Sequence, residues 1–141
     1  MLKNLSPEAQ EERVFELTNQ LNRGIELITE QVERDELAQL NLIACRKARA
    51  SIAYQAGQTY TQVGIQLLGR QAWQRQYDTV LAFHNLATEL AWLCNDADQM
   101  EKSFLTVITQ SRSPFDQIAV YRIKTRSKTA QNKPAEALEV G

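Results

Sequence analysis

Residues 33–60 read ERDELAQLNLIACRKARASIAYQAGQTY, and this stretch decides the fold class. Its apolar and small residues recur at steps of three and four positions: Leu37, Leu40, Ala44 and Ala48, then Ile52, Ala56 and Tyr60. Such spacing places side chains on one face of an α-helix. The stretch therefore predicts two successive amphipathic helices.

The same spacing extends outward in both directions. Further stripes are formed by Leu17, Leu21, Gly24, Ile25 and Ile28, by Val63 and Leu67, by Trp73, Tyr77, Val80, His84, Ala87 and Ala91, and by Met100, Phe104, Val107 and Ile108. No proline, the strongest helix breaker, occurs between Pro7 and Pro114. We therefore expect an all-α protein with each stripe facing a neighbouring helix.

Residues typical of helix ends separate the stripes. Ser6-Pro7 and Ser113-Pro114 place a capping side chain before a proline, as at the start of a helix. Ser113 and Asp116 also have the spacing of a capping box. We expect a helix to begin at each of these two sites.

Other breaks resemble turns between helices. Gly69 and Asn95 end stripes and tolerate the left-handed conformation, and Asp96 can cap the helix that follows. The segment 132–136, Asn-Lys-Pro-Ala-Glu, has the same arrangement of a turn residue before a helix start, 37 positions after Asn95. A helix-pair period of that size is typical of helical-repeat arrays.

One segment has a different pattern. Between Val120 and Thr129, basic residues alternate with other residues, as in an exposed strand. A lone strand would have no sheet to join, so we predict a helix here.

These elements predict one helical-repeat domain over residues 1–141, a right-handed superhelix of antiparallel helix pairs. About three pairs are expected, followed by a truncated fourth. The domain is thus expected to be incomplete at its C-terminus, either as a fragment or as a module completed by another chain.

Composition excludes several classes of protein. Sixteen Lys and Arg against seventeen Asp and Glu give a net charge of -1, so no bulk basic field holds nucleic acid or an anionic membrane. No apolar run is long enough to cross a bilayer. Cys45 and Cys94 lie in helical patterns and suit free thiols of a reducing compartment. We expect a soluble cytoplasmic protein.

The charges form alternating blocks. Residues 1–40 carry nine acids and four bases, 41–75 five bases, 76–101 five acids, and 102–133 seven bases and one acid. Stacked helices would set opposite charges against each other and favour that order. The alternative, solvated faces without pairing, stays open.

Residues for catalysis are few. His84 is the only histidine, and it lies on an apolar stripe, which favours a packing role. Cys45 precedes Arg46 and Lys47, but packing explains it better than redox chemistry. We expect no enzyme activity, cofactor or metal.

One polar cluster interrupts a packing helix. Arg46, Lys47 and Arg49, with Asn41 one to two turns earlier, could hold an acidic peptide or phosphate. Pairing with acids of neighbouring helices is the alternative. The bases between Arg122 and Lys128 could contact nucleic acid, although only Tyr121 could stack on a base there.

Four segments together resemble a known family. They are NQLNRGIELI (19–28), residues 33–60, the segment from Trp73 to Tyr77, and NDADQME (95–101). They resemble the tetratricopeptide-like helical segment of large bacterial multi-sensor signal-transduction kinases. In that family the segment follows a protein-kinase-like and an AAA-type predicted ATPase domain, and precedes GAF and histidine-kinase or cyclase domains. Cys45 stands where the family usually has glycine, and Asn95 with Ala97 replaces a Gly-Asp-Phe-type turn.

The resemblance implies a scaffold and no catalytic activity, because the family's kinase, nucleotide-binding and sensor motifs are not among these residues. We therefore expect a protein-interaction or regulatory scaffold of a signalling kinase, whose partner is a flanking domain or a docked peptide. A free-standing helical adaptor that homodimerises through its open end is the alternative. Nucleic-acid binding is a third, weaker one.

Overall fold

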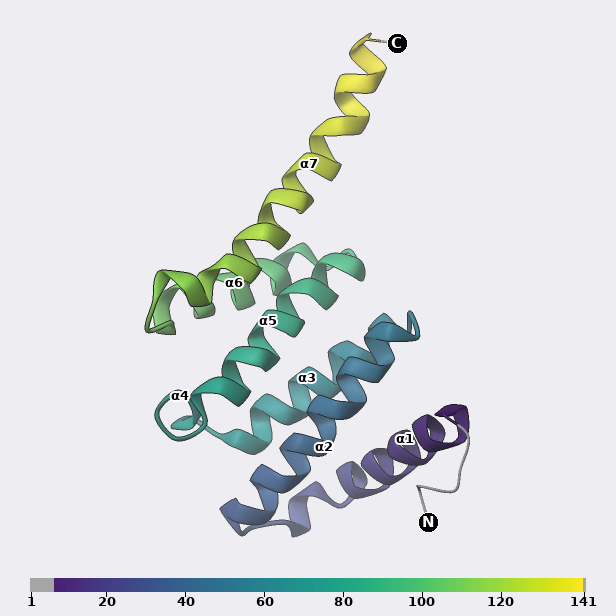
Figure 1. Cartoon of the computed structure of the whole chain (residues 1–141), viewed down its shortest axis with the longest axis vertical. Coiled ribbons are helices and arrows are strands. Elements are labelled where there is room, and N and C mark those ends of the chain that lie inside the picture. Colours follow the sequence, from purple (N-terminus) through teal and green to yellow (C-terminus); the bar gives the residue numbers. More distant parts are fainter. Residues whose placement is uncertain (1–6, 141) are drawn as a thin grey trace. The chain divides into compact units, whose positions relative to one another are not determined.

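The computed structural model describes the backbone of residues 7–140 and the side chains of residues 8–129. Every regular element there is helical and none is a strand, which confirms the all-α prediction (Figure 1). The described chain divides into two compact units, one ending at Phe83 and one beginning at His84.

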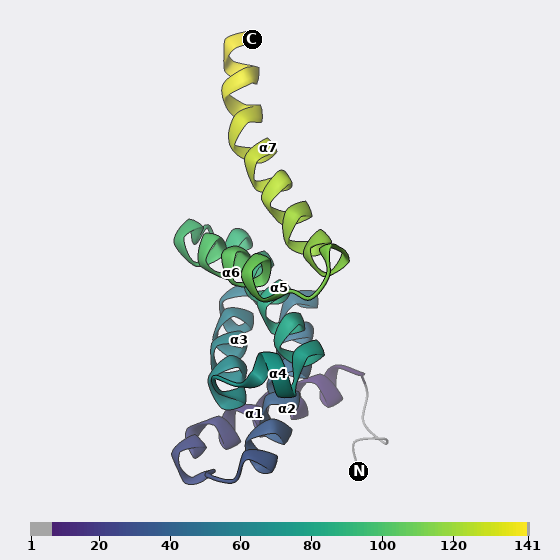
Figure 2. The same ribbon diagram turned by 90° about the vertical axis from the view of Figure 1, so that its left-hand side faces the viewer.

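The first unit begins with three helices: α1 (Pro7–Arg23), α2 (Gln31–Ala50) and α3 (Tyr54–Leu68). A 3-10 turn, η2 (Ile25–Leu27), joins the first two. Helices α2 and α3 form the main contact and lie side by side (Figures 1 and 2). Residues 33–60 thus fold as predicted, into two helices joined by a tight turn.

The core of this unit contains the predicted stripe of α2 together with part of α3. Leu37, Ala44, Ala48, Tyr60 and Leu67 are buried. Gly64 allows a close approach, because a Cβ atom there would lie 2.2 Å from the Phe83 ring. The ring of Phe83 is fully buried and occupies the space that a side chain would need.

Helix α1 contradicts the predicted stripe. Leu17 and Leu21 are 44% and 36% exposed, whereas Thr18 is fully buried. The predicted stripe is therefore wrong for this helix. The side of α1 that lies against α2 and α3 is the one whose Asn22 and Asn19 hydrogen bond to Asn41 and Tyr60.

The turn between α2 and α3 also departs from expectation. Ile52, predicted to begin a stripe, is 71% exposed and has φ 63. The amides of Ile52 and Ala53 donate to the carbonyls of Arg49 and Ala48, which is the Schellman pattern. The hydrogen bonds that end the helix thus require a left-handed residue at position 52.

A break divides the predicted stripe that begins at Trp73. A short helix, α4 (Ala72–Arg75), ends before α5 (Tyr77–Leu93), and the chain is not helical at Gln76. Trp73 and Tyr77 contact each other edge to face across this break, 5.7 Å apart. Gly69 at the end of α3 has φ 82, as its type predicts.

The second unit contains the end of α5, then α6 (Ala97–Gln110), the 3-10 turn η3 (Pro114–Gln117) and α7 (Ile118–Val140). Ala91, Met100 and Ile123, one from each helix, form a buried cluster against which Trp92 packs. Residues Val120 to Thr129 are helical, which confirms the prediction over the strand-like pattern.

The predicted caps of this unit are present, with one difference. Asn95 has φ 64, and the Asp96 side chain accepts from the Gln99 amide at 3.2 Å. Ser113 Oγ accepts from the Phe115 amide at 3.1 Å, so the hydroxyl caps η3 rather than closing the predicted box with Asp116. Pro7 begins α1 as predicted, whereas its expected cap, Ser6, lies outside the described residues.

The helix start predicted near Pro134 is wrong, because α7 continues through that residue to Val140. A proline inside a helix costs about 3 kcal/mol, but the residues around this one are strong helix formers: Ala130, Gln131, Ala135, Glu136, Ala137 and Leu138.

Candidate partner-binding site

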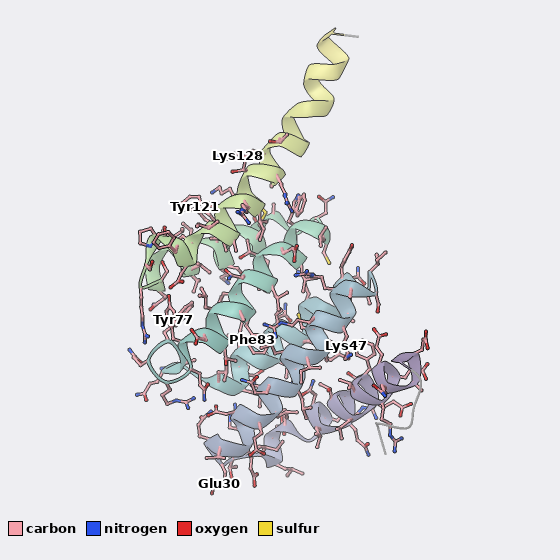
Figure 3. The ribbon with its side chains drawn as sticks, in the orientation of Figure 1. Glu30, Lys47, Tyr77, Phe83, Tyr121 and Lys128 are labelled. Atoms are coloured by element: carbon pink, nitrogen blue, oxygen red, sulfur yellow. The ribbon has the colours of Figure 1, made fainter. Side chains whose placement is uncertain are left out.

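The predicted binding residues lie on α2, but the structure does not bring all four together. Asn41 is fully buried, whereas Arg46 and Arg49 are exposed and Lys47 is half-buried. Lys47 lies near the C-terminal end of α2 (Figure 3). The exposed part of the predicted site is therefore Arg46, Lys47 and Arg49, named here the α2 basic cluster.

Asn41 holds α1 against α2. Its side-chain amide donates to Asn22 Oδ1 at 2.9 Å and to the Leu37 carbonyl at 2.9 Å, and it accepts from Asn22 Nδ2 at 2.8 Å. A buried amide with these partners is satisfied and fixes the register of the two helices. The side chain of Asn41 thus has a structural role in the first unit.

A second polar contact lies further along α1. The Tyr60 hydroxyl donates to Asn19 Oδ1 at 2.8 Å, and the Tyr60 ring stacks on Phe15 with centroids 6.0 Å apart. Burial raises the pKa of Tyr60, although its bond to Asn19 opposes this. The phenol therefore stays protonated and keeps donating at neutral pH.

The α2 basic cluster stands at the C-terminal end of its helix. Lys47 and Arg49 are in the last turn, where the carbonyl ends of the helix dipole favour positive charge. The helix dipole alone thus accounts for the presence of Lys47 and Arg49 at this end of the helix. Guanidinium groups are planar forks that suit carboxylates or phosphates, and Arg46 and Arg49 are exposed residues.

Sequence reasoning missed a polar hub at the opposite end of α2. Arg34 donates to the carbonyls of Gln66 and Leu67 at 3.2 and 3.3 Å, and Arg75 donates to that of Leu68 at 2.9 Å. These carbonyls end α3 and have no partner within their own helix. Arg75 also pairs with Asp35 at 3.0 Å. Arg34 and Asp35 lie more than thirty positions from their partners in this hub, and such contacts leave no local signal in the sequence.

The contacts of this hub lower the pKa of the Asp35 carboxyl. Burial alone would raise its pKa, but hydrogen bonds from Arg75 and Gln31 and the charge of Arg75 lower it overall. Asp35 is thus ionised at neutral pH and keeps Arg75 at the end of α3.

His84 and the two cysteines occupy packed positions. Burial lowers the pKa of His84 to about 4, so the imidazole is neutral at pH 7. Cys45 is buried and Cys94 half-buried, and both are free thiols. Burial and the charge of Asp96 raise the pKa of Cys94, which disfavours the reactive thiolate.

The bases of α7 differ in their surroundings. Lys124 pairs with Glu101 at 2.8 Å and lies 4.3 Å from the centroid of the Phe104 ring. Arg122 and Arg126 instead line a shallow surface hollow with Ile118, Tyr121 and Thr125. Figure 3 places Tyr121 and Lys128 on α7. The predicted basic row thus includes one lysine that stabilises its own unit.

The described residues contain neither a metal-binding group nor a membrane-spanning helix. No group of three or more His, Cys, Asp or Glu side chains in this part of the chain could hold a metal ion. Among the same residues, no helix combines the length and the apolar character needed to span a bilayer.

Comparison with known proteins finds a partial relative. Over 68 residues, 48% of this chain, it is 41% identical to "Hybrid signal transduction histidine kinase G" of Dictyostelium discoideum. The match spans 2% of the length of that kinase. No family model and no solved structure matches the chain. The chain is therefore similar to a small part of a signal-transduction histidine kinase.

Proposed function

We propose that this chain is a non-enzymatic protein-interaction and regulatory scaffold of a signal-transduction kinase in the cytoplasm. The similarity to a signalling histidine kinase is the observation that carries the proposal. It agrees with the segments that resemble the helical part of multi-sensor kinases. In this role the chain transmits the conformational state of one flanking domain to the next.

The all-helical fold supports a tetratricopeptide-like array as the form of this scaffold. The α2–α3 pair, joined by the tight turn at Ile52, has the build of one repeat. Arrays of such pairs bury each pair on the next and bind partners on an extended surface. We propose a right-handed superhelix for the whole array.

The α2 basic cluster is the proposed contact with the partner. Two arginines and a lysine on one helix end suit an acidic segment of a flanking kinase-like or ATPase domain. Asn41 acts indirectly in this proposal, by fixing the helix that carries the cluster.

The test reverses the charges of the cluster. We expect the R46E/K47E/R49E variant to bind the purified kinase-like and ATPase domains at least about tenfold more weakly, measured by isothermal titration calorimetry. The matched control reverses three exposed bases elsewhere, R23E/R70E/K102E, and should leave the affinity unchanged. Equal affinities for both variants, or no binding by the unaltered chain at about 100 µM, would contradict the proposal.

A second candidate is a free-standing helical adaptor that homodimerises. Apolar side chains at the surface of α7 support it, because Ile118 and Tyr121 are 42% and 49% exposed and offer apolar contact to a second copy. Sedimentation distinguishes the two candidates, because only the adaptor forms a stable assembly without a kinase domain.

A further inference from the structure

Helix α7 exposes a side that is both apolar and basic. Ile118 and Tyr121 are 42% and 49% exposed, and they line a shallow hollow together with Arg122, Thr125 and Arg126. Their spacing of three and four positions places these five residues on one side of the helix. We name them the α7 outer face, of which Tyr121 is labelled in Figure 3.

The rest of the second unit holds this face in place. Val120 and Ile123 are buried and lie on the opposite side of α7. The rings of Phe104 and Tyr121 meet edge to face, with their centroids 5.3 Å apart. A surface fixed in this way loses little side-chain freedom when a partner binds to it.

Positive charge dominates the surroundings of the face. Residues 118–129 contain four bases and no acid, and the nearest acid before them is Asp116 in η3. Lys124 pairs with Glu101 at 2.8 Å. Arg122 and Arg126 are exposed residues that form no ion pair with any residue the structure describes. Their guanidinium groups therefore remain available to the carboxylates of a partner.

We propose that the α7 outer face docks an acidic amphipathic helix of a partner protein. An apolar side chain of the partner fills the hollow beside Ile118 and Tyr121, and two of its carboxylates pair with Arg122 and Arg126. The two arginines are four positions apart, about 6 Å along the helix axis, so they match two acids with the same spacing on a helix that lies alongside. This surface belongs to the second unit, so the inference goes beyond the α2 basic cluster and is independent of it.

Other occupants fit the face less well. Single-stranded nucleic acid needs successive stacking surfaces along a basic groove, but Tyr121 is the only aromatic residue between positions 118 and 129, and Lys124 is paired with Glu101. An anionic membrane needs a broad apolar side, whereas Ile118 and Tyr121 are the only large apolar residues exposed within 118–129. Two α7 outer faces in contact would set arginines against arginines. Charge and apolar area together therefore favour an acidic protein segment.

The experiment measures the binding of a designed peptide to the full chain. The probe is a fluorescein-labelled amphipathic peptide of about 18 residues, with leucines at every third or fourth position and glutamates spaced by four beside them. We expect a Kd of about 1–50 µM in fluorescence anisotropy at low salt, and a weaker affinity as salt is added. During a titration followed by NMR, the amide shifts of residues 118–126 should change most.

Two variants remove the two kinds of contact separately. R122E/R126E reverses the charge of the face and should lose at least about tenfold in affinity, whereas Ile118→Gln keeps the charge and should lose about threefold to tenfold. R122E/R126E should instead bind a second peptide in which lysines replace the glutamates. A peptide with serines in place of the leucines should bind the unaltered chain weakly, because it leaves the hollow empty.

Control variants separate docking from folding and from the α2 basic cluster. R23E/R70E reverses two exposed bases of the first unit and should bind the probe like the unaltered chain. R46E/K47E/R49E should also keep the affinity for the probe. The substituted residues of α7 are exposed, so the dichroism spectra of their variants should match that of the unaltered chain.

Each contrary outcome has a distinct meaning. No binding of the probe by the unaltered chain at about 500 µM overturns the inference. Binding that is lost in R46E/K47E/R49E but kept in R122E/R126E assigns the peptide to the α2 basic cluster, which overturns this inference and leaves the proposed function standing. Tighter binding of oligo(dT) or of phosphatidylserine vesicles than of the peptide, lost in R122E/R126E, overturns it in favour of nucleic acid or a membrane. A dimer in sedimentation that Ile118→Gln dissociates and the peptide does not would assign the face to a second copy.

Discussion

The two units hold their helices together by different means. In the first, hydrogen bonds between side chains join the helices, as in the Asn22–Asn41 pair and the Tyr60–Asn19 bond. In the second, Ala91, Met100 and Ile123 form an apolar cluster, and Phe104 meets the edge of Tyr121 at 5.3 Å. In the first unit polar pairs thus attach α1 beside an apolar core that includes Leu67 and Phe83, whereas the cluster that joins the helices of the second unit is apolar.

Polar pairing and apolar burial constrain the position of a helix differently. Buried amide pairs fix the register but contribute little net free energy, about 1 kcal/mol each. Apolar burial contributes more and tolerates small shifts. Helix α1 is therefore fixed in orientation while its leucines stay outside, whereas α6 buries its apolar stripe.

The largest effect should come from the apolar core of the second unit. Phe104→Ala removes a ring that is 7% exposed, together with its contacts to Tyr121 and Lys124, and should lower the free energy of unfolding by about 3–5 kcal/mol. Urea unfolding followed by Trp92 fluorescence in a Trp73→Phe background measures it. Phe115→Ala is the matched control, since Phe115 is 81% exposed and its loss should be small. Equal losses would show that burial does not govern this unit.

Acidification should weaken the protein next most strongly. The pKa of His84 is about 4 in the folded chain and 6.5 unfolded, so the unfolded chain takes up the proton first as the pH falls. The free energy of unfolding should drop by about 2–3 kcal/mol between pH 7 and 4.5, and this loss should disappear in His84→Gln. Asp35, whose pKa is lowered, adds its loss only at lower pH, as its carboxylate is protonated. A His84→Gln variant with the same pH profile as the unaltered chain would refute this assignment.

The polar contact of the first unit should have a smaller effect. Asn41→Ala leaves the Asn22 amide without its partner and should cost about 2 kcal/mol, seen as faster amide exchange in α1. The double variant Asn22→Ala/Asn41→Ala should cost less than the two single losses together, by about 1 kcal/mol. Strict additivity would mean that the two amides act separately.

The smallest expected effect is a gain. Ile52 has φ 63, a conformation that costs a β-branched residue about 1–2 kcal/mol. Ile52→Gly should therefore raise the free energy of unfolding by about 1 kcal/mol, whereas Asn95→Ile at the equivalent turn of the second unit should lower it. Thermal unfolding of the two variants measures the difference. Shifts of Tm in the same direction for both variants would contradict the prediction.

The sequence was sufficient for helix content and for most of the core. The stripe from Val80 to Ala91 contains buried Val80, Ala87 and Ala91, and Asn95 and Asp96 mark a real turn. These features depend on local spacing and on residues that define caps, so a single chain displays them.

The predictions fail where contacts with other parts of the chain determine the local structure. Leu17 and Leu21 follow a helical stripe, but the side of α1 that lies against its neighbours is the one whose Asn19 and Asn22 hydrogen bond to Tyr60 and Asn41. Position 52 takes a left-handed conformation because helix-ending hydrogen bonds require it, against the preference of isoleucine.

The candidate site was predictable only in part. The basic residues after Cys45 stand out in the sequence, and Arg46 and Arg49 are exposed as a binding role needs. The burial of Asn41 depends on Asn22, and the Arg34–Arg75 hub depends on the end of α3. Neither feature can be predicted until the packing of the helices against one another is known.

Because glycine has no side chain, position 64 should be coupled in evolution to position 83. Since the Phe83 ring fills that space, a homologous chain with alanine or a larger residue at 64 requires a smaller residue than phenylalanine at 83. The two positions should therefore change together when homologous chains diverge, and a pair that varies independently would mark a lineage in which α3 and α5 have moved apart.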